Sequence, residues 1–322
     1  MTYKESYGTF KKEIKEIKEI KSKKKLGDIL FENLTLIFAL IILALVFYVA
    51  LEMFNDSAES RDKFGFGFIF SSEWNPVKED FGALPFIYGT IVSSIVALLI
   101  SLPVSIGVAV FLSEIVHKSV RTPISFLIEI LAAIPSIIYG FWGIFVFAPF
   151  MRTTIQPMLE STLGFLPFFQ GNMYGTGLLT ASIILAIMIT PIISAITRDV
   201  LKAIPKSQRE AAYALGATKW EAIKMALLNA RSGILGGAVL GLGRAIGETM
   251  AVTMVIGNKA QIVASLFEPA YSMASVIANE FAEASGSLHI SSLIEVGFIL
   301  FGVTFIINSL ARLLIYSVTR NA

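Results

Sequence analysis

The chain has 322 residues, of which 55% are hydrophobic and 16% are charged, with a mean hydropathy of +0.73 and a formal net charge of +2. Soluble domains are usually about a quarter charged and at most about half apolar, so this composition excludes large soluble, disordered, collagenous and nucleic-acid-binding proteins. Cysteine is absent, which excludes disulfides, iron–sulfur clusters and thiol catalysis. The two histidines, His117 and His289, are far apart in the sequence, which argues against a histidine-based metal site.

Six apolar stretches are long enough to cross a bilayer as helices, each of which needs about 20 residues. The period-2 alternation of barrel strands is absent, and a helix is the other structure that satisfies its own backbone groups in a bilayer. We therefore predict an all-α integral membrane protein with six transmembrane helices. Pro103, Pro135 and Pro191 fall inside spans and are expected to kink or interrupt them. The predicted spans are approximately 34–51, 86–112, 126–150, 176–196, 233–256 and 293–318.

The first span, 34–51, is expected to remain in the protein as a membrane anchor. The apolar core of a signal peptide has about 7–15 residues, and this run is longer and follows 33 residues. No small-x-small cleavage site comes directly after it, because the next residues are Glu52, Met53, Phe54 and Asn55.

Lysine and arginine are concentrated on one side of the predicted spans. The N-terminal arm, the loop after the second span, the segment 197–232 and the C-terminal end carry 20 of the 26 basic residues, whereas the opposite side carries 5. The remaining one is Arg244, inside the fifth span. Because cytoplasmic loops are enriched in Lys and Arg, we predict that both termini are cytoplasmic.

Two segments outside the apolar spans have a composition of their own. In the arm, Ile14, Ile17 and Ile20 form a slanted apolar stripe on a lysine-rich helix. We interpret it as a helix held near anionic lipid, with docking to a specific partner as the alternative. The acidic segment after the first span is too short for an independent domain and could form a small cap. The predicted limits are 1–33 for the arm, 34–51 for the first span, 52–85 for the extracytoplasmic segment, 86–318 for a core of five spans and 319–322 for a cytoplasmic tail.

The segment 197–232, between the fourth and fifth spans, is long for a connector. Glu210, Ala211 and Ala212 open a predicted helix that Gly216 breaks, because glycine allows the positive φ of a sharp turn. A second short helix is expected to resume through Trp220. A short polar helix pair with an apolar face suits docking into a groove of another protein, and an amphipathic connector lying on the membrane is the alternative.

The spacing of this loop resembles a known family. Glu-Ala-Ala, three residues and then Gly, at 210–216, resembles the EAA loop of ABC-importer permeases, although the later Ile-x-Leu-Pro-like ending is replaced here by Ala226, Leu227, Leu228 and Asn229. The stretches 133–151 (AIPSIIYGFWGIFVFAPFM) and 241–258 (GLGRAIGETMAVTMVIGN) closely resemble the PstC-type permeases of phosphate (Pst) importers.

This resemblance implies a type I ABC importer (MetI-like) permease fold in the inner, cytoplasmic membrane of a prokaryote. It implies that the chain forms half of a path for inorganic phosphate. The implied partners are a PstA-type permease, a PstB-type ATPase dimer and an external PstS-type phosphate-binding protein. Within such a complex, Glu210, Ala211, Ala212, Gly216 and Trp220 are expected to couple to the ATPase, which carries the ATP and Mg; no cofactor is expected in this chain.

Arg244 lies near the middle of the predicted fifth span, 11 residues from one end and 12 from the other. A charge at the bilayer centre costs about 2.5–3.5 kcal/mol on insertion scales, so Arg244 is expected to face the bundle interior or a water-filled path. Glu248 follows at i+4, on the same helical face. Two interpretations stay open: an ion pair that helps helices pack, or a guanidinium that binds two oxygens of a passing anion while Glu248 orients it.

Other residues of the fifth span also allow two interpretations. The hydroxyls of Thr249 and Thr253 could line the anion path or bond carbonyls of their own helix. Glycines four residues apart let helix backbones approach closely. We interpret the glycine face as contacting the partner permease or the pore, with packing inside the chain as the alternative; its main members are Gly237, Gly241, Gly243 and Gly247.

No G-x-x-x-x-G-K-[ST] loop, nucleophile elbow or metal-ligand cluster occurs in the sequence. We therefore assign no catalytic residue and no metal site, and predict a translocation subunit rather than an enzyme. Alternative functions are a permease for another oxyanion such as molybdate or sulfate, an ATP-independent channel or carrier, and a membrane sensor of phosphate status.

Overall fold

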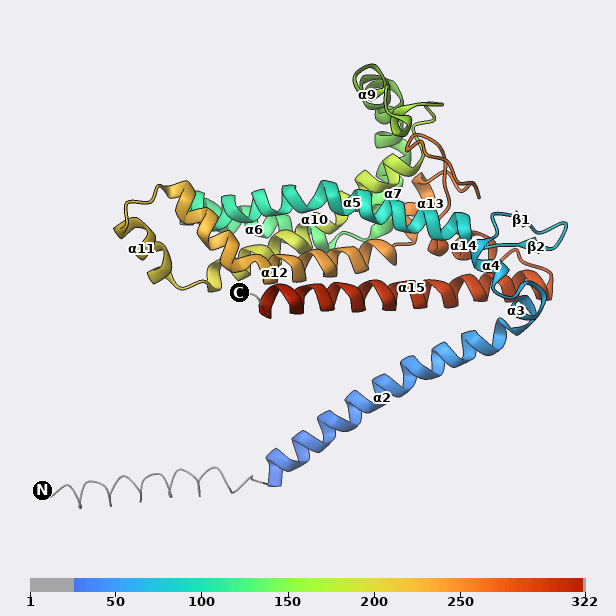
Figure 1. Ribbon diagram of the computed structural model, residues 1–322, viewed down its shortest axis with the longest axis horizontal. Helices are drawn as coiled ribbons and strands as arrows, with labels where there is room; N and C mark the ends of the chain where they lie inside the picture. Colours follow the sequence, from blue (N-terminus) through green and yellow to red (C-terminus); the bar gives the residue numbers. More distant parts are fainter. Residues whose placement is uncertain (1–25, 321–322) are drawn as a thin grey trace, which may run out of the picture. The chain divides into compact units, whose positions relative to one another are not determined.

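The protein is described from a computed structural model that covers residues 26–320 (Figure 1). Most of the predicted arm, including Ile14, Ile17 and Ile20, and the last two residues of the tail lie outside the described residues. The chain divides into two compact units, Met1–Glu52 and Met53–Ala322, and each is described by itself.

The described part of the first unit is a single helix. α2 (Leu26–Asp56) has 31 residues and enters the second unit in its last turn. Its central turns are apolar on every side, as in Leu36, Ile41 and Phe47. At a rise of about 1.5 Å per residue it is longer than the hydrocarbon core of a bilayer, and a helix apolar all round suits a lipid environment.

Six helices within residues 26–320 are long and apolar enough to cross a membrane, in agreement with the predicted all-α fold. The predicted limits were wrong for two of them. The third span begins at Ser136 rather than near residue 126, and the fifth begins at Lys219 and ends at Ile246 rather than covering 233–256. The six helices are Gly27–Asp56, Leu84–Ile115, Ser136–Leu163, Leu178–Ala203, Lys219–Ile246 and Ser287–Ser317.

The three span prolines have different effects. Pro103 lies inside α5 (Leu84–Val110) and Pro191 inside α10 (Leu178–Ala203), and neither ends its helix. Pro135 separates α6 (Lys118–Ala133) from α7 (Ser136–Trp142) and has extended ψ at 137°. A proline removes a backbone donor and disfavours helical geometry in the residue before it, which explains why the third span starts only after this position.

The other elements complete the second unit. After α7 the third span continues through two π-helical turns, η2 (Gly143–Phe147) and η3 (Met151–Ile155), which flank α8 (Ala148–Phe150), to α9 (Gln156–Leu163). A two-stranded antiparallel sheet pairs β1 (Trp74–Asn75) with β2 (Asp80–Phe81). The remaining elements are α3 (Ala58–Phe64), α4 (Gly67–Phe70), η1 (Phe111–Ile115), η4 (Pro167–Phe169), α11 (Lys206–Ala214), α12 (Lys219–Ile246), α13 (Met250–Val255), α14 (Met273–Glu280) and α15 (Ser287–Arg320).

α10 is the central helix of the second unit and packs against both α5 and α12 (Figure 1). Ile184, Ile189 and Ile193 of α10 are fully buried. They belong to one cluster with residues of α5, α7 and α13, whereas a smaller cluster near the start of α12 includes Leu201 and Ile223. The core is therefore built around a helix that is buried on most of its surface.

The segment 52–85, expected as a cap, packs onto the beginnings of α5 and α15. Phe68 and Phe81 are almost completely buried together with residues of α14 and α15. The indole Nε1 of Trp74 donates to Glu280 Oε2 at 2.9 Å, and His289 stacks on Phe81 with ring centroids 5.2 Å apart. From Met53 onward this segment is part of the second unit.

Candidate functional site

Arg244 lies in the last turn of α12 and its side chain is exposed. The prediction that it sits at the middle of the fifth span was wrong, because the helix begins earlier and ends two residues after it. A cation near a helix C-terminus is favoured by the helix dipole. Within residues 26–320 the guanidinium has no hydrogen bond or ion pair. Arg244 is therefore available to bind an anion.

Glu248 does not lie on the same helix as Arg244. Gly247 ends α12, and Glu248 Oε1 accepts a hydrogen bond of 3.3 Å from the backbone N–H of Ala251 in the first turn of α13. The expected i+4 arrangement was wrong because the glycine-rich end of α12 breaks there and the carboxylate instead satisfies a free donor at the next helix start. No ion pair between Arg244 and Glu248 is formed in the described residues.

The two threonines after the break bond the backbone. Thr253 Oγ1 donates to the carbonyl oxygen of Thr249 at 2.7 Å, and Thr249 Oγ1 donates to that of Gly247 at 3.4 Å. Each hydroxyl has a single proton, so in this conformation neither donates to an anion. This geometry favours the interpretation in which these threonines bond carbonyls of their own segment.

α7 and α13 bring the two helix breaks into one packed arrangement. Gly140 of α7 lies so close to α13 that a Cβ there would be 2.6 Å from Met254 Sδ and 3.2 Å from Ala251 Cα. Tyr139 donates a hydrogen bond of 2.8 Å to the Leu131 carbonyl, which spans the break at Pro135. Tyr139 and Arg244 are thus both positioned by interrupted helices, a backbone feature common in membrane transport proteins.

The glycine face of α12 is divided between two surroundings. A Cβ on Gly237 would be 3.2 Å from Ile196 Cγ2, and one on Gly241 would be 2.7 Å from Ile193 Cδ1, so both residues pack on α10 of the same chain. A Cβ on Gly243 would be 3.5 Å from Asn308 Oδ1 of α15. A Cβ on Gly247 would have only the Gly243 carbonyl oxygen of its own helix within 4 Å. The interpretation of Gly237 and Gly241 as a face against a partner or pore was wrong, since α10 occupies that face.

The loop predicted over 197–232 consists of a helix pair joined by a tight turn. α11 ends at Ala214, and Gly216 has φ of 82°, a conformation that suits glycine. α12 begins with a capping box, in which Thr218 Oγ1 accepts from the Glu221 N–H and Glu221 Oε2 accepts from the Thr218 N–H. The Thr-x-x-Glu spacing is a sequence signal for this start. The second helix is not short, because α12 continues to Ile246.

The turn of the helix pair presents apolar side chains to the outside. Leu215 is 90% exposed and Trp220 is 66% exposed, whereas Ile223, one turn further along α12, is buried at 5%. Glu210 and Ala211 are exposed and Ala212 is buried. The predicted coupling residues thus lie around one exposed tip, whose apolar surface suits contact with another protein.

The tip is fixed to the membrane helices by Arg209, which sequence reasoning missed. Its Nη2 atom lies 2.7 Å from Glu114 Oε1 in η1 and 2.9 Å from the Leu201 carbonyl, and Nη1 donates to the Ile204 carbonyl at 3.1 Å. No local sequence pattern predicts the Arg209–Glu114 ion pair, because the two residues are 95 positions apart. A second ion pair, between Arg198 of α10 and Glu129 of α6 at 3.2 Å, lies on neighbouring elements.

Comparison with solved structures identifies the fold. Chains of the MetNI methionine ABC transporter in inward-facing conformations, from two crystal forms, superpose with a TM-score of 0.50 and 20% identity, covering 74% of this chain and 94% of theirs. Together with the six candidate spans, the interrupted helices and the exposed helix pair, this similarity places the chain in the class of helical membrane proteins with a type I ABC importer permease fold. Residues 101–320 match the family described as "Binding-protein-dependent transport system inner membrane component", and the chain belongs to this family.

Curated relatives cover nearly the whole chain. Proteins named "Phosphate transport system permease protein PstC" from Mesorhizobium japonicum and Pasteurella multocida are 48% and 47% identical over 292 and 298 residues, which is 89% and 91% of this chain and 89% and 93% of theirs. The relative with that name from Haemophilus influenzae is 46% identical over 291 residues, 89% of this chain and 92% of its own. The resemblance to PstC-type permeases is confirmed.

Proposed function

We propose that this chain is a transmembrane permease subunit of an ATP-driven inorganic phosphate importer. The observation that carries the proposal is the identity of 46–48% to phosphate transport system permeases over about nine-tenths of both chains. The chain provides half of the translocation path and carries out no chemical step. A separate PstB-type ATPase dimer binds and hydrolyses ATP with Mg, so this chain needs no cofactor of its own.

The remaining partners and the location complete the proposal. A PstA-type permease pairs with this chain, and an external PstS-type protein delivers phosphate. The complex lies in the cytoplasmic membrane of a prokaryote with both termini of this chain inside, which agrees with the excess of Lys and Arg on that side. In this orientation the tip around Leu215 and Trp220 faces the cytoplasm, where it can contact the ATPase.

Arg244 is the residue that we assign to the phosphate path. Its guanidinium is unpaired within the described chain and can offer two parallel N–H donors to two oxygens of one phosphate. Glu248 stays nearby in sequence as a negative charge that keeps the anion from binding too tightly, since a transit site must release its ion. Thr249 and Thr253 play at most a secondary part, because their protons bond backbone carbonyls.

Transport in a defined system tests this proposal. The full complex with its permease, ATPase and binding-protein partners is reconstituted into vesicles, and uptake of labelled phosphate is measured with and without ATP. We expect ATP-dependent uptake that excess unlabelled phosphate inhibits and that sulfate and molybdate do not. Uptake inhibited more strongly by molybdate or sulfate would assign another oxyanion, and uptake without ATP would assign a channel or carrier.

A further inference from the structure

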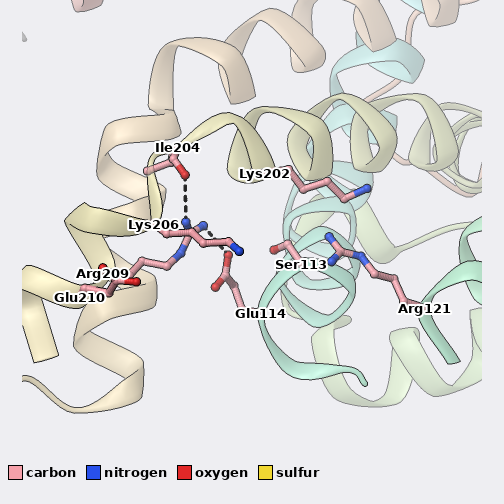
Figure 2. A pocket seen from close by; sticks show the side chains of 8 residues that line it. All are labelled: Ser113, Glu114, Arg121, Lys202, Ile204, Lys206, Arg209 and Glu210. Carbon is pink, nitrogen blue, oxygen red and sulfur yellow. Dashed lines mark hydrogen bonds and ion pairs between the residues drawn. The ribbon is translucent and has the colours of Figure 1, made fainter. Parts of the chain in front are cut away.

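A cavity of about 370 Å³ opens where the end of the second span meets the helix pair. It lies between η1, the start of α6, the end of α10 and α11 (Figure 2). Its volume is within the range of small-ligand sites in proteins. Arg244 does not line this cavity. It lies 15 residues after Asn229 of α12, which donates to Gln208 of α11 at 2.8 Å, and this corresponds to about 22 Å of helix, so the cavity is separate from the site assigned to the phosphate path.

The lining of the cavity is rich in positive charge. Arg121, Lys202, Lys206 and Arg209 contribute four basic groups, against two carboxylates, Glu114 and Glu210, so the lining has an excess of two positive charges. Glu114 is already engaged with Arg209 at 2.7 Å. Lys202 lies 3.8 Å from Asp199 and is 44% exposed. The excess favours a negatively charged occupant.

Several polar groups of the cavity are buried and unsatisfied. Nε and Nη2 of Arg121, Oγ of Ser113 and Nε of Arg209 have no solvent exposure and no hydrogen-bond partner in residues 26–320. Leaving a buried donor unpaired costs about 1–3 kcal/mol, and more for a charged group. Figure 2 shows Arg121 reaching into the cavity from one side and Lys206 from the other, with Ser113 between them.

We infer that this cavity binds a phosphate-type oxyanion, either inorganic phosphate or the phosphate of an anionic lipid headgroup. The Arg121 guanidinium and the Ser113 hydroxyl supply directed donors, and Lys206 supplies a compact charge. Both sources present a tetrahedral phosphorus with at least two unesterified, negatively charged oxygens, and basic pockets at the ends of membrane helices suit each of them. The inference goes beyond the proposed function, since it does not require the bound anion to be the transported one.

An anion in this cavity connects α6 to α11. Arg121 belongs to α6, whereas Lys206 and Arg209 belong to the helix that carries the exposed coupling residue Glu210. The bound anion therefore holds α11 in the position in which Arg209 contacts Glu114. Occupancy of the cavity thus stabilises one position of the coupling tip.

The absence of cysteine allows a direct test of occupancy. Lys202 lines the cavity and is 44% exposed, so Lys202→Cys places an accessible thiol there. Its rate of alkylation by a maleimide is followed on this chain, in the permease pair alone and in the complete complex. In phosphatidylcholine vesicles, inorganic phosphate at ten times its dissociation constant is expected to slow alkylation about elevenfold by mass action, with chloride at equal ionic strength as the reference. In phosphatidylglycerol vesicles without added phosphate, slowing of the same order identifies the lipid headgroup as the source.

Two control variants make the result specific. Ser207→Cys places a thiol on the exposed surface of α11 outside the cavity, and its alkylation rate is expected to be unchanged by either anion source. Arg121→Gln combined with Lys202→Cys is expected to lose the protection. Arg121→Gln combined with Ser207→Cys is expected to be alkylated at the rate of Ser207→Cys alone, which shows that the chain is folded. The inference is overturned if neither source protects Lys202→Cys or if protection persists in Arg121→Gln. It is also overturned if the thiol is protected only in the complete complex and not by either anion in the permease pair alone, since a side chain of the ATPase then fills the cavity.

Discussion

Arg209 of α11 and Glu114 of η1 form an ion pair of 2.7 Å across 95 residues of sequence. Their side chains are only 17% and 13% exposed, and Arg209 also donates to two backbone carbonyls at the end of α10. The pair joins the end of the second span to α11, the helix that carries the proposed coupling residues Glu210, Ala211 and Ala212. Because its four hydrogen-bonding groups come from three segments, a displacement of α11 has to move the ends of two membrane helices or break this contact.

Breaking the Arg209–Glu114 pair is expected to separate ATP hydrolysis from transport. Glu114→Gln and Arg209→Gln each remove one charge from a mostly buried contact, and a hydrogen bond to a charged group is worth about 1.5–3 kcal/mol. We expect each variant to lower thermal stability by that order and phosphate uptake more than ATPase activity. The measurements are the unfolding midpoint in detergent and both rates in vesicles.

An exposed pair serves as the control for that prediction. Lys63 and Glu79 lie 4.0 Å apart with side chains 44% and 62% exposed, and such pairs contribute about 0–1 kcal/mol. Lys63→Gln is therefore expected to leave stability and coupling unchanged. Equal behaviour of Glu114→Gln and Lys63→Gln would show that the buried pair has no part in coupling.

Trp220→Ala is expected to weaken association with the ATPase without destabilising this chain. The indole is 66% exposed beside Leu215, so its removal leaves no cavity in the core. Aromatic side chains at the centre of an interface commonly contribute 2 kcal/mol or more, which is about thirtyfold in affinity. The measurement is ATPase binding to the reconstituted permease pair, with Leu313→Ala on the exposed face of α15 as the control. Unchanged affinity in Trp220→Ala would remove the tip from the docking surface.

Arg244→Gln is expected to lower phosphate uptake by roughly 10- to 150-fold, the equivalent of the 1.5–3 kcal/mol of a charge-assisted hydrogen bond. Arg244→Lys keeps the charge and loses the planar pair of donors, so an intermediate rate is expected. Arg312→Gln, an exposed arginine on α15, is the matched control and should transport normally. Initial rates of labelled phosphate uptake at equal complex levels give the comparison, and a normal rate in Arg244→Gln would exclude this residue from the path.

Gly89→Ala is expected to destabilise the second unit by about 1–3 kcal/mol through overpacking. A Cβ at this position of α5 would overlap the backbone carbonyl of Tyr271. Backbone atoms cannot move aside as the end of a flexible side chain can. Gly107→Ala on the same helix has nothing within 4 Å and should stabilise by roughly 0.5–1 kcal/mol, since alanine loses less conformational entropy in a helix. Unfolding midpoints of the two variants in one detergent test the difference in sign, and equal shifts would contradict the close contact.

The helical class and the six spans could be predicted from sequence because each depends on local composition. A bilayer requires about 20 apolar residues and an internally bonded backbone at every span, so long apolar stretches identify spans without knowledge of their neighbours. The loop at 210–216 was recognised for a similar reason, since the turn at Gly216 depends on the conformation of one residue.

The limits of the spans depended on features that are less local. The break after Ile246 follows from competition between continuing α12 and starting α13 with the Glu248 carboxylate on a free N–H. A count of apolar residues does not register this competition, and Arg244 and Glu248 were therefore expected on one continuous helix. The start of α12 at Lys219 was accessible through the Thr218–Glu221 capping box.

The sequence by itself determined that this is a six-span helical membrane protein with a glycine-hinged loop of the ABC-importer permease type. Only the tertiary structure decided which groups meet: Gly237 and Gly241 face α10, Arg209 pairs with Glu114, and Arg121 and Ser113 line one cavity. The physical reason is that burial in a bilayer acts on each residue through its own polarity. A contact between helices instead depends on distances among side chains far apart in the chain, which the packing of α5, α10 and α12 sets.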